Sequence, residues 1–146
     1  MMYKQFLNLL FCLSLAAAAY VVECDEIKAE EIEKYSPTCA IQKQIDNFNQ
    51  VKQTFDNPYE ACSSRETLFL VYGRCEDYPD EAVFCSPQQK KNRNCEEFNQ
   101  PVCGELIDGD YYFCDNEFFF ETFKNYCFAC QKELVRFYTL GDCKEF

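Results

Sequence analysis

Cysteine is the feature that most constrains how this chain can fold, since it occupies 12 of the 146 positions. Cysteines at this density in a short chain are typical of proteins that mature in an oxidising compartment and are held together by disulfides. The first residues fit that route, because Lys4 precedes a largely apolar stretch that ends in Ala17, Ala18 and Ala19, a small-residue cleavage site. We therefore expect residues 1–19 to be a signal peptide and the mature chain to be secreted and extracellular.

The overall composition excludes several classes of function. The formal net charge of −11 argues against nucleic acid or an anionic membrane as a partner. No segment after the signal is apolar for long enough to cross a bilayer. The chain has no histidine, which removes Ser-His-Asp and Cys-His catalysis and every histidine-ligated metal site. We therefore predict a protein that is not an enzyme and that holds no cofactor or metal.

The two halves of the chain match each other when the second is moved back from Thr122 to Thr54, a shift of 122 − 54 = 68 positions. The matched pairs are Thr54 with Thr122, Phe55 with Phe123, Asn57 with Asn125, Ala61 with Ala129, Cys62 with Cys130, Phe69 with Phe137, Gly73 with Gly141 and Cys75 with Cys143. Self-similarity of this kind predicts two units of one repeat, residues 20–76 and 77–146, joined at a short polar segment near Pro79.

Two cysteines of the second unit have no counterpart in the first. Tyr59 stands where the second unit has Cys127, and no cysteine between Cys24 and Cys39 matches Cys95. Loss of one cysteine of a bridge would leave the other as an unpaired thiol, whereas loss of both cysteines leaves no unpaired thiol. The paired absence therefore predicts that Cys95 and Cys127 are bonded to each other.

Local patterns predict a few elements. Residues 68–72 and 134–140 are rich in β-branched and aromatic side chains and end at a glycine, which is typical of strands. The spacing of Ile41, Ile45, Phe48 and Val51 predicts a helix, and the composition of residues 25–34 predicts a short acidic helix. Residues 88–94 are polar and basic, and we expect them to be an exposed loop.

Three other clusters have ordinary interpretations. The aromatic runs at residues 111–113 and 118–120 are expected to pack in the core or between the units rather than to form a binding platform. Cys127 and Cys130 have the spacing of a redox pair, but in so cysteine-rich a chain we expect structural bridges. Residues 108–110, Asp-Gly-Asp, lack the remaining ligands of an EF-hand, so a turn is expected there rather than a calcium site.

Two runs of the second unit have a distinctive spacing. Seven residues separate Cys95 from Cys103, which is preceded by Pro-Val, and residues 122–130 read Thr-Phe-Lys-Asn-Tyr-Cys-Phe-Ala-Cys. Cys85 precedes these runs and Cys143 follows them. In these features the second unit resembles the Kazal family of serine-protease inhibitors, whose second run has tyrosine where this chain has phenylalanine. The resemblance extends to the first unit only through the internal repeat.

The resemblance implies a set of disulfides. The family joins its first cysteine to the fifth, the second to the fourth and the third to the sixth, which gives Cys85–Cys130, Cys95–Cys127 and Cys103–Cys143 here, with Cys24–Cys62 and Cys39–Cys75 in the first unit. Cys114 is left over, either for a bond to a second chain or as a free thiol. Ten residues separate Cys114 from Cys103, where the family often has its fourth cysteine, so Cys95–Cys114 is the alternative bridge.

The resemblance also implies a fold and a function. The expected fold is α+β: two small disulfide-rich units in tandem, each with a short helix and a small antiparallel sheet. The loop from Cys95 to Cys103 would enter a protease active site as a substrate does, with Glu96, Glu97, Phe98 and Asn99 in contact and Glu97–Phe98 as the reactive bond. Asn125 matches the asparagine that supports this loop in the family.

The expected partner is therefore an extracellular serine protease. Its specificity pocket would be basic, because burial of the Glu97 carboxylate in an apolar or acidic pocket is costly. The first unit lacks the bridge that anchors such a loop, so we expect it not to inhibit. The alternative is a non-inhibitory extracellular binding or structural module that uses the acidic faces or the aromatic insertion, and a hydrolase or redox enzyme is a more remote third class.

Overall fold

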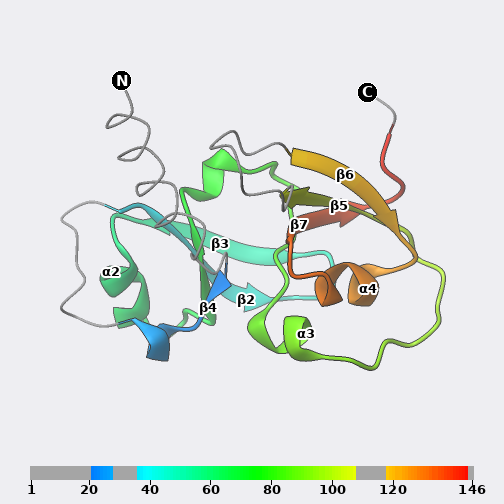
Figure 1. Ribbon diagram of the computed structural model, residues 1–146. Helices are drawn as coiled ribbons and strands as arrows, with labels where there is room; N and C mark the ends of the chain where they lie inside the picture. The colour runs from blue at the N-terminus through cyan, green and yellow to red at the C-terminus, as the bar shows by residue number, and fades with distance from the viewer. Residues whose placement is uncertain (1–20, 28–35, 108–117, 145–146) are drawn as a thin grey trace, which may run out of the picture.

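The computed structural model describes residues 21–27, 36–107 and 118–144, and the structural statements below refer to these ranges. Two antiparallel sheets, each accompanied by a short helix, lie next to each other, with α2 beside the first sheet and α4 beside the second (Figure 1). The elements are β1 (Val21–Val22), η1 (Cys24–Glu26), β2 (Thr38–Gln44), β3 (Gln50–Phe55), α2 (Pro58–Ser63), β4 (Phe69–Tyr72), η3 (Cys75–Asp77), α3 (Pro87–Lys91), β5 (Val102–Ile107), β6 (Phe118–Phe123), α4 (Tyr126–Gln131) and β7 (Val135–Leu140).

The same order of elements, strand, strand, helix and strand, occurs twice along the chain. We call residues 21–76 the N-terminal half and residues 77–144 the C-terminal half. The strand order is β1-β4-β2-β3 in the first sheet and β6-β5-β7 in the second, so β4-β2-β3 corresponds to β7-β5-β6. Gly73 and Gly141 follow β4 and β7 with φ angles of 88° and 97°, a backbone conformation that glycine adopts without strain. This requirement explains why both halves have a glycine at that position.

The described residues contain five disulfides, two within the N-terminal half and three within the C-terminal half. The bonded pairs are Cys24–Cys62, Cys39–Cys75, Cys85–Cys130, Cys95–Cys127 and Cys103–Cys143, with Cα–Cα distances between 4.7 and 5.6 Å. They are the five pairs that the family resemblance implies, and Cys95–Cys127 is also the pair predicted from the paired absence. Every cysteine of the described ranges is bonded in this way. Cys12 and Cys114 lie outside those ranges.

The segment that connects the halves is part of the core. Tyr78 and Phe84 are buried, and their rings lie 4.9 Å apart in an edge-on contact. Both rings also contact Phe137 of β7, at 6.0 and 6.3 Å, in a cluster that includes Ile41 and Val71 of the first sheet. Tyr78 and residues 82–84 thus fill the space between the two sheets, whereas residues 79–81 of the connecting segment are exposed.

Hydrogen bonds from the N-terminal half hold the same segment. The Lys52 Nζ donates to the carbonyl oxygens of Asp80 and Ala82, at 3.0 and 2.5 Å. The side-chain amide of Gln50 donates to the carbonyl of Phe84 and accepts from its N–H, at 2.8 and 2.9 Å. The two halves are therefore connected by directed polar contacts as well as by a shared apolar core.

The helix predicted from Ile41, Ile45, Phe48 and Val51 is wrong. These residues lie on β2, on β3 and in the turn between them, and Ile41 is fully buried whereas Ile45 and Val51 are exposed. The turn forms because the Asp46 carboxylate accepts hydrogen bonds from the N–H groups of Phe48 and Asn49, at 2.7 and 2.9 Å. A helical period that spans two strands was a coincidence of spacing.

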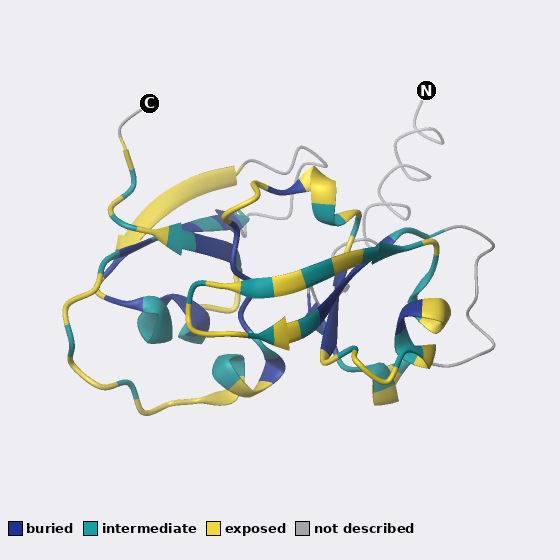
Figure 2. Ribbon diagram, turned by 180° about the vertical axis from the view of Figure 1, so that it is seen from behind, coloured by how far each residue is buried: buried dark blue, intermediate teal, exposed yellow. Residues whose placement is uncertain are grey.

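Two other local predictions need correction, and two are confirmed. Within the expected loop 88–94, α3 forms because Ser86 and Gln89 make a capping box around Pro87. Phe118, Phe119 and Phe120 are not in the core: they lie on β6 and are 47%, 43% and 46% exposed (Figure 2). The strands expected at residues 68–72 and 134–140 are present as β4 and β7.

Several expectations fall on parts of the chain that the structure does not describe. Of the acidic helix expected at residues 25–34, the described part contains the short η1 and residues 28–35 lie outside it. The signal at residues 1–19, the turn at 108–110 and the aromatic run at 111–113 also lie outside. In the described ranges, no helix has the length and apolar character needed to cross a membrane.

Candidate functional site

The loop between Cys95 and Cys103 follows the outer side of α4. The chain leaves α3, passes around α4 and enters β5 (Figure 1). Cys95 is bonded to Cys127 of α4, and Cys103, which belongs to β5, is bonded to Cys143. The loop residues between these anchors are mostly exposed (Figure 2). The segment is thus attached at both ends and accessible along its middle.

The Asn125 side chain holds the backbone in the middle of this loop. Its side chain is fully buried, and the Oδ1 atom accepts from the N–H of Cys127 at 3.0 Å, which caps α4. The Nδ2 atom donates to the carbonyl oxygens of Glu96 and Phe98, at 3.1 and 2.9 Å. These two carbonyls lie on either side of Glu97, so one buried amide fixes the backbone on both sides of that residue.

Backbone hydrogen bonds hold the C-terminal part of the loop. The N–H of Gln100 donates to the carbonyl of Lys124 at 3.0 Å, and the N–H of Gly141 donates to the carbonyl of Pro101 at 2.8 Å. Earlier in the loop, the N–H of Phe98 donates to the carbonyl of Glu96 at 3.1 Å. The loop conformation therefore follows from contacts with α4, with the residue before Asn125 and with the end of β7.

Glu97 and Phe98 point to different surroundings. Glu97 is exposed and its carboxylate accepts a hydrogen bond from the Lys124 ammonium, which lowers the pKa of Glu97 through the hydrogen bond and the positive charge. Exposed pairs of this kind contribute little to stability. Phe98 is half-buried, and its ring lies 5.8 Å from that of Tyr126 on α4. The acidic side chain thus faces the solvent while the aromatic one faces the protein.

The structure brings together most of the residues that the sequence suggests for the site. Glu96, Glu97, Phe98 and Asn99 form one stretch next to Asn125, in which only Phe98 is half-buried and the others are exposed. Lys124 was missed, because a single lysine in a polar run has no signal that distinguishes it from any surface charge. Cys127 and Cys130 are each bonded to another cysteine, so the expected structural bridges are present in place of a redox pair.

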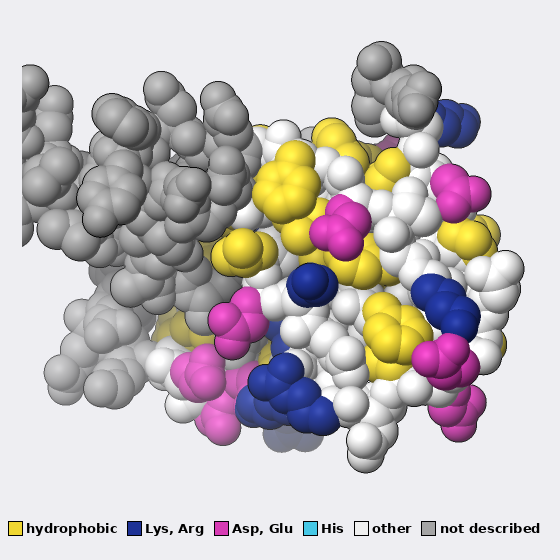
Figure 3. All heavy atoms as spheres, turned by 45° about the vertical axis from the view of Figure 1, so that its right-hand side comes forward, with side chains coloured by type: hydrophobic (Ala, Val, Ile, Leu, Met, Phe, Trp, Pro, Cys, Tyr) yellow, Lys and Arg dark blue, Asp and Glu magenta, His cyan; other side chains and the backbone are white. Residues whose placement is uncertain are grey.

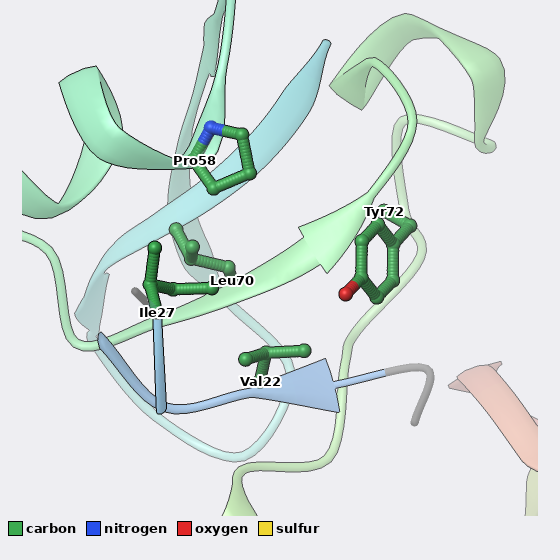
Figure 4. Close-up of a pocket in the computed structure, with 5 residues that line it drawn as sticks. All are labelled: Val22, Ile27, Pro58, Leu70 and Tyr72. Carbon is green, nitrogen blue, oxygen red and sulfur yellow. The ribbon is translucent and has the colours of Figure 1, made fainter. Parts of the chain in front are cut away.

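Other surfaces of the described chain offer less. An apolar hollow lies between α2, β1 and β4, lined by Val22, Ile27, Pro58, Leu70 and Tyr72, and its volume is about 10 Å³, roughly the room for one water molecule (Figure 4). Ligand pockets are usually about 300–1,000 Å³ and contain polar groups that orient the ligand. On the face in Figure 3, hydrophobic, acidic and basic side chains are interspersed. Within the described ranges no three metal-binding side chains lie together.

Comparison with known proteins identifies no relative of this chain. No family model matches it, and no curated protein or solved structure is significantly similar to it.

Proposed function

We propose that the protein is a secreted, Kazal-like inhibitor of an extracellular serine protease, that it is not itself an enzyme, and that it binds through Glu96, Glu97, Phe98 and Asn99. The observation that carries this proposal is the pair of hydrogen bonds from Asn125 to the carbonyls of Glu96 and Phe98. A loop already held in one exposed conformation loses little conformational entropy when it binds in a cleft. Such a loop suits a protease active site, which binds an exposed peptide segment.

The same contacts provide a reason why the bound loop would not be released as a product. Cleavage begins with attack on the carbonyl carbon of Glu97 and frees the amine of Phe98. Asn125 would keep both sides of the cut bond in place, and the Cys95–Cys127 bridge would hold the new C-terminal end near the protein. Because the two ends stay close, the bond is re-formed more readily than the fragments separate.

The chemistry of Glu97 favours one class of protease. An acidic side chain at the reactive bond suits a specificity pocket that contains arginine or lysine, since an unpaired carboxylate is costly to bury. On binding, Glu97 would exchange its contact with Lys124 for one with the pocket. A protease that cleaves after acidic residues is therefore the proposed target.

A non-inhibitory binding module is the second candidate, and the exposed β6 favours it. Phe118, Phe119 and Phe120 are half-exposed on β6, with Phe118 and Phe120 on one face of the strand and Phe119 on the other, and Arg136 lies over the ring of Phe118 at 4.2 Å. Aromatic side chains are enriched at protein interfaces. A binding module of this kind does not depend on an accessible Glu97–Phe98 bond.

Inhibition assays with the refolded, disulfide-bonded protein separate the two candidates. The panel contains an acidic-residue-specific serine protease and trypsin. We expect the native protein to inhibit the first, and Glu97→Arg to transfer inhibition to trypsin, because the pocket-filling side chain is changed. Glu66→Arg is the matched control, since it makes the same charge change at an exposed position of the N-terminal half and should not alter the target.

Two results would contradict the proposal. Absence of inhibition by both the native protein and Glu97→Arg, with all five bridges verified by mass spectrometry, would exclude an inhibitory loop. Inhibition of trypsin by Glu97→Arg without any inhibition by the native protein would mean that the loop is competent in form but that the native role is that of the second candidate.

A further inference from the structure

The turn between β2 and β3 extends from the N-terminal half to the side of α4, the helix around which the candidate loop passes (Figure 1). Phe48, at this turn, has its ring 6.4 Å from that of Tyr126 on α4 and 6.4 Å from that of Tyr138 on β7. Both contacts are edge-on, with interplanar angles of 86° and 89°, the geometry that aromatic pairs favour. A side chain of one half therefore packs in the aromatic cluster of the other.

The same cluster reaches the loop. Tyr126 is stacked with Tyr138 at 6.3 Å and contacts Phe98 at 5.8 Å. Tyr126 also lies in the sequence between Asn125, which holds the loop carbonyls, and Cys127, which is bonded to Cys95. The position of the Tyr126 ring is thus coupled to the Asn125 hydrogen bonds and to the Cys95–Cys127 bridge. Phe48 supports that ring from the side of the N-terminal half.

Polar contacts keep the turn in place. The hydroxyl of the buried Tyr138 donates to the carbonyl of Asn47 at 2.5 Å, across 91 positions of sequence. Burial raises the pKa of Tyr138 above its ordinary value, so the hydroxyl keeps its proton and remains a donor. Gln50, at the start of β3, pairs with both backbone groups of Phe84. Since these contacts flank Phe48 on both sides, its ring has little freedom to leave Tyr126.

We infer that the N-terminal half is a positioning element for the loop of the C-terminal half, and that Phe48 is its positioning residue. The inference rests on the proposed function, because it assigns the half that lacks the loop bridge a role in the inhibition performed by the other half. Phe48 acts through Tyr126: it limits the movement of the first turn of α4, and with it the movement of Asn125 and Cys127. Loss of the Phe48 ring removes no donor or acceptor of the loop's own hydrogen bonds, but lets these bonds open more often.

Amide hydrogen exchange tests this directly in the full chain. The reporter is the N–H of Gln100, which is bonded to the carbonyl of Lys124. In Phe48→Ala we expect exchange at Gln100 to be about 2- to 10-fold faster, as follows from loss of one or two aromatic contacts. Phe48→Tyr keeps the ring and should restore exchange close to the native rate. Phe55→Ala is the matched control, a half-buried phenylalanine of the same half that packs in a different cluster.

The outcomes are decisive in each direction. Faster exchange at Gln100 in Phe48→Ala but not in Phe55→Ala supports the inference. Equal exchange in Phe48→Ala and the native protein overturns it, and so does an equal acceleration in both alanine variants, which would reflect general loss of stability. If Phe48→Ala does not form the five bridges, Phe48→Leu replaces it, with the same comparison and a smaller acceleration expected.

An inhibition assay separates this inference from the proposed function. Where the native protein or Glu97→Arg inhibits a protease, Phe48→Ala should raise the dissociation constant by about the factor seen in exchange and should shift the equilibrium toward the cleaved loop. If neither protein inhibits any protease, the proposed function fails. The exchange comparison still decides whether the N-terminal half positions the loop.

Discussion

The two halves of the molecule share a frame but differ at the loop. Thr54 and Thr122 each accept a hydrogen bond from the backbone of the last cysteine of their half, both at 2.9 Å. Ser36 and Gln100 each donate to the residue before the capping asparagine, both at 3.0 Å. The two halves therefore have the same hydrogen bonds, with the same lengths, at equivalent positions of a shared frame.

The difference concerns one bridge. Asn57 caps α2 by accepting from the N–H of Glu60 at 2.9 Å, as Asn125 caps α4. In the N-terminal half, however, Tyr59 replaces Cys127 and is half-exposed. A helix, a sheet and two bridges are thus sufficient for the frame. The third bridge, Cys95–Cys127, anchors the loop and is present in the half whose loop carries the proposed function.

The largest expected effect comes from converting the C-terminal half to the pattern of the N-terminal one. Cys95→Ser combined with Cys127→Tyr removes the loop bridge, and we expect the free energy of unfolding to fall by roughly 2–4 kcal/mol. The sheets should remain in circular dichroism, and inhibition should be lost because the loop has lost an anchor. Cys24→Ala with Cys62→Ala is the control, with a similar loss of stability in denaturant unfolding but retained inhibition. Inhibition that survives removal of Cys95–Cys127 would show that the bridge does not belong to the function.

The next effect compares the two capping asparagines. Asn125→Ala leaves two loop carbonyls and one helix N–H without their partner, so we expect a loss of about 2–3 kcal/mol in denaturant unfolding. Asn57→Ala removes a helix cap and should cost about 1 kcal/mol. Asn125→Asp is informative because it keeps the acceptor for Cys127 and removes the two donors. Equal losses in the two alanine variants would mean that the loop contacts of Asn125 contribute nothing beyond the cap.

The smallest expected effect comes from the hydrogen bond between Tyr138 and Asn47, one of those that join the halves. Tyr138→Phe removes the hydrogen bond to Asn47 and should cost about 1 kcal/mol at neutral pH. Because burial raises the pKa of Tyr138 in the folded state, the unfolded chain releases this proton first as the pH rises through 10. The contribution is therefore present below that pH and is lost above it. Urea titrations at a series of pH values should show a steeper alkaline loss of stability in the native protein than in Tyr138→Phe, and identical slopes would contradict this assignment.

The bridges and the last strand of each half could be predicted, whereas the hairpin could not. The repeat predicts Cys95–Cys127 and the family resemblance implies the other four bridges, while β4 and β7 follow from aromatic and β-branched runs that end at Gly73 and Gly141. The β2–β3 hairpin was missed because Ile41, Ile45, Phe48 and Val51 satisfy a helical period. Their true environments depend on strand partners elsewhere in the chain. Phe118–Phe120 were misjudged for a related reason, since hydrophobicity does not reveal that β6 pairs with β5 alone among the described strands.

The candidate site divides in the same way. The sequence by itself determined the Cys95–Cys127 bridge, because the repeat displays the cysteine positions twice, and its resemblance to a known family implied the other four bridges, the acidic loop and the asparagine that supports it. Only the tertiary structure decided that Asn125 holds the carbonyls on both sides of Glu97, that Lys124 contacts its carboxylate and that Phe48 packs against Tyr126. These contacts join residues that are 27 to 126 − 48 = 78 positions apart, and such pairs depend on how the chain packs rather than on any local pattern.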